Sequence, residues 1–115
     1  MDAEIFRDYC LSKPSAVEDF PFDEDVLVFK VGGKMFALTS LERLPFQFNL
    51  KCDPEWAVEL RASYDGVIPG WHMNKRHWNT VLMDGSISTD LAKKLIDHSY
   101  DLVVAKLPKK IREHL

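Results

Sequence analysis

Apolar residues recur along the chain with two different periods, which distinguish the expected helices from the expected strands. Behind Asp2, a favourable N-cap, they follow helical spacing until Pro14 disfavours further helix. Two apolar runs, residues 26–31 and 35–38, then flank Gly32-Gly33, a pair able to take positive φ in a tight turn. The chain is therefore predicted to begin with a helix and a hairpin.

The middle of the chain continues with a strand and a short helix. Residues 46–52 alternate between apolar and polar side chains, which is the period of a strand with one face in water. Asp53-Pro54 combines an N-cap with a proline at the first helical position, and Trp56 and Leu60 follow about one turn apart. These features predict a helix that ends near Asp65-Gly66.

The last third predicts another strand, in the second half of residues 71–83, and a long helix from a cap at Ser88 or Thr89 to about Leu107. The inner stripe expected for this helix is Leu91, Leu95, Ser99, Leu102 and Val103, and the residues expected outside are Lys93, Lys94, Asp97, His98 and Asp101. Strands follow one another too closely for parallel crossovers. We therefore expect one domain, residues 1–115, of the α+β class, with an antiparallel sheet covered by helices on one face.

Composition narrows the class of protein but leaves its function open. A chain of 115 residues that is 46% hydrophobic and 29% charged is typical of a soluble globular domain. An acidic start, and the lack of any run of about 18 apolar residues, predict a cytoplasmic protein without a membrane segment. The two cysteines, Cys10 and Cys52, are too few for a disulfide framework and are expected to be buried thiols.

Motifs of the common enzyme classes are absent, so we expect a non-enzymatic protein without a cofactor or metal. The sequence has no glycine-rich phosphate loop, G-x-S-x-G, C-x-x-C or H-E-x-x-H. His72 and His77 are five residues apart, a spacing that only the two arms of a hairpin could bring together as ligands. An acidic run without calcium-loop spacing is expected to be a solvated turn; it consists of Glu18, Asp19, Asp23, Glu24 and Asp25.

Residues 71–78 combine two tryptophans, two histidines, an asparagine and a Lys-Arg pair. Because Asn74 tolerates turn geometry, we expect Lys75-Arg76 at a hairpin tip that Trp71 and Trp78 brace. Such a tip could contact phosphates as a wing. Alternatively, the tryptophans fill a core while the Lys-Arg pair keeps a turn in water.

The segment 69–81, together with Asp84-Gly85 and residues 96–103, resembles the MmcQ/YjbR family of small bacterial proteins. The family's H-M-N-K-x-H-W core is matched by His72, Met73, Asn74, Lys75, His77 and Trp78, whereas Trp71 stands where the family commonly has tyrosine. The resemblance implies a CyaY-like fold and a DNA-binding role through a double-wing motif. The family's frataxin-like relationship also suggests the hypothesis that the protein binds iron. The first helix offers only a small acidic cluster for this, namely Asp2, Glu4 and Asp8.

Three functional hypotheses follow, and DNA binding ranks first. The residues expected to contact phosphates are Lys34, Lys75, Arg76, Lys109, Lys110 and Arg112. The net charge of −3 gives no long-range attraction to DNA, so this binding is expected to be weak or nonspecific. The second hypothesis is a protein-interaction or small-ligand module built on the His/Asn/Trp cluster around residues 71–78, which predicts a concave site instead of a projecting tip. Metal binding ranks third.

Overall fold

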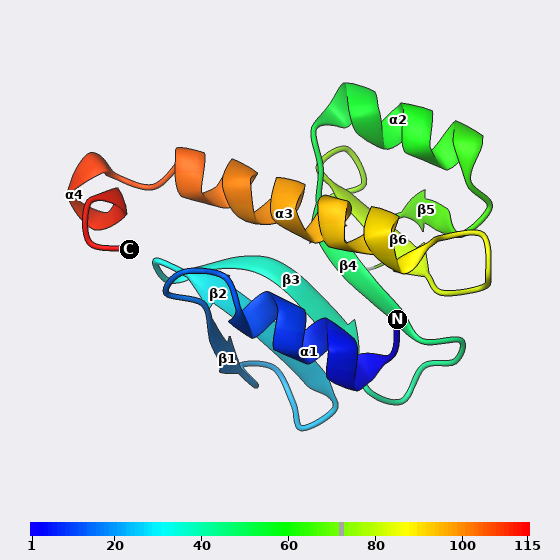
Figure 1. The fold of residues 1–115 in the computed structure, drawn as a ribbon, viewed down its shortest axis with the longest axis horizontal. Coiled ribbons are helices and arrows are strands. Elements are labelled where there is room, and N and C mark those ends of the chain that lie inside the picture. The colour runs from blue at the N-terminus through cyan, green and yellow to red at the C-terminus, as the bar shows by residue number, and fades with distance from the viewer. Residues whose placement is uncertain (72) are drawn as a thin grey trace.

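A six-stranded antiparallel sheet with helices on one face forms the frame of the protein, which confirms the predicted α+β architecture (Figure 1). The computed structural model describes residues 1–71 and 73–115. The strands are β1 (Val17–Asp19), β2 (Val26–Val31), β3 (Lys34–Ser40), β4 (Gln47–Lys51), β5 (Val67–Pro69) and β6 (Trp78–Leu82). The helices are α1 (Ala3–Leu11), α2 (Pro54–Ser63), α3 (Thr89–Ala105) and α4 (Lys109–Arg112). In space the strands follow the order β1-β2-β3-β4-β6-β5.

Three N-caps start the longer helices where the sequence predicts them. Asp2 accepts the amide of Ile5 at 2.8 Å, Asp53 that of Trp56 at 3.1 Å, and Ser88 that of Leu91 at 3.0 Å. Each carboxylate or hydroxyl satisfies a backbone N–H that has no partner within its helix. None of the described helices is both long and apolar enough to cross a membrane.

The β2–β3 hairpin distributes its side chains over both faces of the sheet. It turns at Gly32-Gly33, both with positive φ (56° and 80°), as predicted. A β-bulge makes Phe36 an extra residue in β3, so Phe36 and Ala37 both join the core beneath the helices. Met35 and Leu38 belong instead to a cluster on the opposite face.

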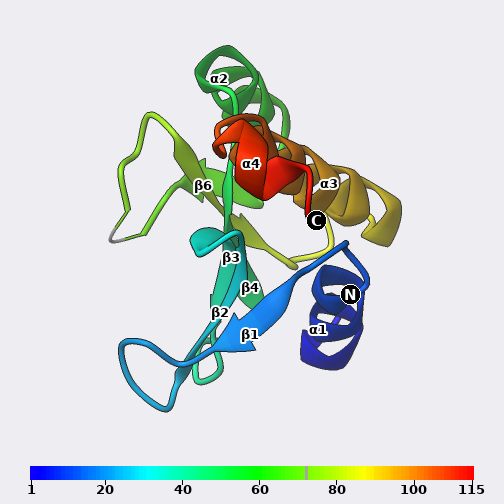
Figure 2. The same ribbon diagram turned by 90° about the vertical axis from the view of Figure 1, so that its left-hand side faces the viewer.

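The larger core lies between the sheet and the helices, which Figure 2 shows on one side of the strands. The Phe6 ring of α1 stacks on Phe48 with centroids 4.5 Å apart and meets Phe29 edge-on at 5.6 Å. Cys10 and Cys52 are free thiols buried in this core, as expected. Burial raises the pKa of both thiols, that of Cys52 to about 11.

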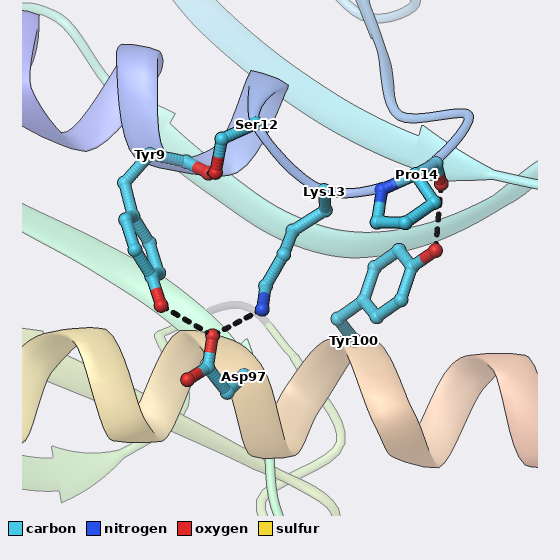
Figure 3. A network of polar contacts seen from close by, with 6 residues as sticks. All are labelled: Tyr9, Ser12, Lys13, Pro14, Asp97 and Tyr100. Atoms are coloured by element: carbon cyan, nitrogen blue, oxygen red, sulfur yellow. Dashed lines mark hydrogen bonds and ion pairs between the residues drawn. The ribbon is translucent and has the colours of Figure 1, made fainter.

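Two residues expected on the outer face of α3 make specific contacts instead. Asp97 accepts a hydrogen bond from the Tyr9 hydroxyl at 2.6 Å and pairs with Lys13, because α1 lies beside α3 (Figure 3). His98 is half-buried, and its Nε2 accepts the backbone N–H of Asp53 at 3.0 Å. The periodicity of α3 indicates which side faces the sheet, but it does not reveal the neighbouring helices.

Candidate functional site

The face of the sheet turned away from the helices carries its own apolar cluster. Val28, Leu38 and Trp78 are buried there, and Met73 packs against them. Trp78 is only 7% exposed and lies at the start of β6, so it fixes the base of the 70–77 connection. In Figure 2 the described part of this connection and the connection between β1 and β2 both lie on the side of the sheet away from α1.

A hollow of about 370 Å³ lies on this face, and we call it the open-face pocket. It is lined by Phe22, Val26, Leu38, Thr39, Ser40, Arg43, Gln47, Phe48, Asn49, Trp71 and Met73. The volume falls within the range of about 300–1,000 Å³ of small-molecule sites, which are mostly apolar with a few placed polar groups. The pocket therefore has the dimensions and the chemistry of a ligand site.

A closed circuit of three hydrogen bonds holds Trp71 at the pocket wall. The backbone N–H of Trp71 donates to the Thr80 hydroxyl at 2.9 Å, and that hydroxyl donates to the Asn49 amide oxygen at 2.5 Å. The Asn49 amide nitrogen donates in turn to the Trp71 carbonyl at 3.3 Å. The Trp71 N–H is thus bound to β6 and the Trp71 C=O to β4, so this wall of the pocket is preformed.

Asn49 and Thr80 are site residues that the sequence analysis missed. They face one another as register partners on β4 and β6, and both are buried. The alternation of residues 46–52 was interpreted as a strand with one face in water, which is wrong at Asn49 because Trp71 covers it. The available signal was the pair of polar side chains in two predicted strands, but their registry appears only in the folded sheet.

Arg43 is the only charged side chain among the described residues that line the pocket. Its guanidinium carbon lies 4.6 Å from the centroid of the Trp71 ring, within range of a cation–π contact. No described residue forms an ion pair with Arg43. The pocket is therefore apolar over most of its wall and positively charged at one place.

The other polar groups of the lining are mostly committed to the protein itself. The Thr39 hydroxyl donates to the Gln47 carbonyl at 2.6 Å, and the Gln47 side chain donates to the Pro45 carbonyl at 3.3 Å. Among the described residues, none makes a hydrogen bond with the Ser40 hydroxyl. Arg43 and Ser40 are thus two lining residues whose side-chain donors make no hydrogen bond to any described residue.

The Lys75-Arg76 pair forms a turn that is fastened to its own base. The Asn74 side chain accepts the Arg76 amide at 3.0 Å, in agreement with the predicted turn geometry. The Lys75 ammonium donates to the Gly70 carbonyl at 2.9 Å. Lys75 is therefore engaged within the connection by its ammonium group, although both Lys75 and Arg76 are exposed.

The base of this connection depends on the absence of a side chain at Gly70. Its N–H donates to the Trp78 carbonyl at 2.9 Å. A Cβ added there would lie 2.9 Å from both the Cβ and the carbonyl oxygen of Trp78. The close approach of the two chain segments is what a glycine permits.

A second charged region, which we call the basic end, consists of three neighbouring lysines, Lys34, Lys51 and Lys106, and of the α4 cations Lys109, Lys110 and Arg112. Leu107 and Ile111 pack over Gly32, which places α4 beside the β2–β3 turn, as both ribbon views show. Burial, followed by repulsion from Lys106 and Lys34, holds the pKa of Lys51 below its ordinary value. Glu113 pairs with Lys109 at 3.9 Å and offsets part of this charge.

The residues expected to contact phosphates thus fall into two groups. Lys34 follows the Gly32-Gly33 turn, on which Leu107 and Ile111 pack, so the start of β3 lies beside α4. The connection between β5 and β6 lies apart from α4 in both ribbon views. Of the two tryptophans expected to brace the hairpin tip, Trp71 lines the pocket, while Trp78 is buried in the cluster on the same face. The hypotheses that involve His72 fall outside the described residues.

Three of the acidic residues weighed as metal ligands have other partners. Asp2 caps α1, Glu18 pairs with Arg7 at 2.6 Å, and Asp19 pairs with Lys30 at 3.2 Å. Within residues 1–71 and 73–115, no three His, Cys, Asp or Glu side chains gather in a way that could hold a metal ion.

Comparison with known proteins shows similarity along almost the whole chain. A family model described as YjbR matches residues 11–102. The uncharacterized protein YbdF of Escherichia coli O157:H7 is 44% identical over 108 residues, covering 93% of this chain and 88% of that protein. The uncharacterized protein YjbR of Escherichia coli strain K12 is 37% identical over 108 residues, covering 93% and 91% respectively.

Two solved structures have a similar fold. The crystal structure of Deinococcus radiodurans protein DR2400 superimposes with a TM-score of 0.93 at 39% identity, covering 98% of this chain and 86% of that chain. A crystal structure of a Pseudomonas syringae protein gives a TM-score of 0.76 at 31% identity, covering 89% of this chain and 98% of that chain.

Proposed function

Since the chain belongs to the YjbR family, and the names of these relatives state no activity, we propose a function from the geometry of its own site. We propose that the protein binds a small, mainly apolar molecule in the open-face pocket and catalyses no reaction. The observation that supports this proposal is the preformed hollow of about 370 Å³, whose Trp71 wall is held by Asn49 and Thr80.

Preformation favours binding because little conformational freedom remains to be lost. Trp71 is 47% exposed, although its backbone is fastened at both its N–H and its C=O. An apolar ligand would cover part of this ring and of the Leu38 and Met73 side chains. Removing that surface from water contributes roughly 25 cal/mol per Å² of apolar area.

A neutral apolar dye such as Nile red tests this proposal by fluorescence titration. We expect saturable binding to the wild type, weakened about tenfold or more by Trp71→Ala, since the wall of the pocket is then lost. Phe20→Ala is a matched control, because Phe20 is an aromatic residue of similar exposure (48%) outside the pocket lining. No saturable binding, or equal weakening by both variants, would reject the proposal.

DNA binding is a second candidate, and the basic end is the feature that favours it. Lys34 and Lys106 lie close enough to disfavour the charged form of Lys51, so cations distant in the sequence share one surface. A phosphate backbone would relieve that repulsion and release counterions. Tight binding is not expected, because the chain as a whole carries a net charge of −3.

Charge-reversal variants distinguish DNA binding by the basic end from DNA binding by the 70–77 connection. In titrations of labelled duplex at about 50 mM and 200 mM salt, we expect affinity to fall with salt. The pair Lys34→Glu and Lys106→Glu should abolish binding, whereas Lys75→Glu with Arg76→Glu should reduce it less. Binding that is absent at low salt, or insensitive to the first pair, would reject this candidate.

A further inference from the structure

We infer that the ligand of the open-face pocket is an amphipathic carboxylate, with an apolar body against Leu38 and Met73 and one carboxylate group on Arg43. This inference rests on the proposed function, since it specifies what the same pocket takes.

The charge of the pocket comes from Arg43 alone. None of the described lining residues is acidic, and no described residue pairs with the Arg43 guanidinium. Its contact with the Trp71 ring, at 4.6 Å, draws on the positive charge and uses none of its five N–H donors. A cation beside an apolar wall, whose N–H donors no described residue occupies, is a site for an anionic oxygen group.

One guanidinium favours a carboxylate over a doubly charged phosphate. The planar fork of arginine matches the two oxygens of a carboxylate, and the single charges then balance. The Ser40 hydroxyl, three residues before Arg43 and also in the lining, can donate a further hydrogen bond. A dianion would be left with an uncompensated charge against an apolar wall, which is costly.

The rest of the lining requires an apolar body on the same molecule. Leu38 and Met73 offer hydrocarbon and thioether surface, and the Asn49 amide has both of its polar atoms bound to Trp71 and Thr80. A small polar anion would leave this apolar surface uncovered. The net charge of −3 gives anions no general attraction, and Arg43 is the charged residue of the described lining, so within this pocket a preference for a carboxylate comes from Arg43.

Octanoate and octanol are matched probes, because they share the alkyl chain and differ in the charged group. At about pH 8, where the carboxylate is ionised, we expect calorimetry to show octanoate binding about tenfold more tightly than octanol. Arg43→Gln should remove that difference, so that the two probes bind this variant with affinities within about twofold of one another. Arg61→Gln, on α2 and outside the pocket lining, is the control and should leave both affinities within about twofold of wild type.

The outcomes separate the two levels of the inference. If octanol binds and octanoate binds no more tightly, the carboxylate inference is overturned while the proposed binding function stands. The same conclusion follows if Arg43→Gln leaves the preference intact, or if Arg61→Gln removes it equally. If neither probe binds, the proposed function fails and the carboxylate inference fails with it.

Discussion

The Thr80 hydroxyl donates to the amide oxygen of Asn49 at 2.5 Å across the β4–β6 pair, while it accepts the Trp71 N–H at 2.9 Å. A single hydroxyl thereby joins two strands to the connection that borders the open-face pocket. Both of its hydrogen bonds involve partners next to an apolar cluster, where water is poorly placed to replace it. We therefore expect stability and the proposed ligand binding to be coupled at Thr80.

Thr80→Val tests this coupling, since it keeps the shape of the side chain and removes the hydroxyl. The Asn49 oxygen and the Trp71 N–H lose their partner, so we expect a loss of about 1–3 kcal/mol of stability in urea unfolding. Amide hydrogen exchange at Trp71 should become faster. Thr89→Val is the control. Among the described residues, the Thr89 hydroxyl is bonded only to the terminal amine of Met1, at 3.2 Å, and a change within about 0.5 kcal/mol is expected. Equal effects of the two variants would contradict the role given to Thr80.

Gly70→Ala should displace the base of the 70–77 connection. The added Cβ would lie 2.9 Å from two atoms of Trp78, one of them a backbone oxygen that cannot easily move. Overpacking of this kind costs about 1–3 kcal/mol. We expect both the urea midpoint and the affinity for Nile red to fall, and normal values for both would show that the close approach is not required.

The Tyr9–Asp97 contact predicts a loss of stability in alkali. The hydrogen bond to Asp97, followed by burial, raises the pKa of Tyr9 from 10.0 to about 12. Because the folded state holds its proton more tightly than the unfolded state, this stabilisation is complete below about pH 10 and disappears as the pH rises towards 12. A Tyr9→Phe variant removes this titrating hydroxyl and retains Tyr100, whose hydroxyl donates a hydrogen bond to the Pro14 carbonyl at 2.6 Å (Figure 3).

Urea unfolding at about pH 9 and about pH 11 tests whether stability decreases with rising pH as predicted. Wild-type stability should fall more steeply between the two values than that of Tyr9→Phe. An equal decrease in the unfolding free energies of the two proteins would mean that ionisation of Tyr9 does not affect stability.

His98 predicts a loss of stability in acid. Burial lowers the pKa of His98 below its ordinary 6.5, against the opposing effects of Asp53 and Asp101. Its stabilisation is thus present above about pH 6.5 and is lost as the pH falls through the depressed value. His98→Gln retains an acceptor for the Asp53 N–H and cannot titrate, so its unfolding free energy should fall less than that of the wild type between about pH 7 and pH 5. An equally steep fall in the variant would exclude His98 as the cause.

Local sequence signals predicted the elements of this fold well. The caps at Asp2, Asp53 and Ser88 and the turn at Gly32-Gly33 act within a few residues, so they can be identified without knowledge of the rest of the chain. The strands β1 and β5, of three residues each, were not located individually, because so short a segment has no measurable period. Helix α4 was expected only as a basic tail.

The candidate site was harder to predict because long-range contacts build it. Trp71 was singled out by composition, and it does line the pocket. The sequence gives no signal for Arg43, which lies in an ordinary connection between β3 and β4, or for Asn49, which lies in a strand of alternating residues. Their importance follows from the 70–77 connection folding back over β4, a contact between residues more than twenty positions apart in the sequence.

Intermolecular nuclear Overhauser effects between octanol and the methyl groups of the protein test the central claim most directly, because they locate the bound ligand. We predict contacts to the methyl groups of Val26, Leu38 and Met73, on the sheet face that the helices leave uncovered. Contacts confined to exposed apolar residues elsewhere, such as Val58 on α2 or Ile111 on α4, would contradict the assignment of the pocket as the binding site.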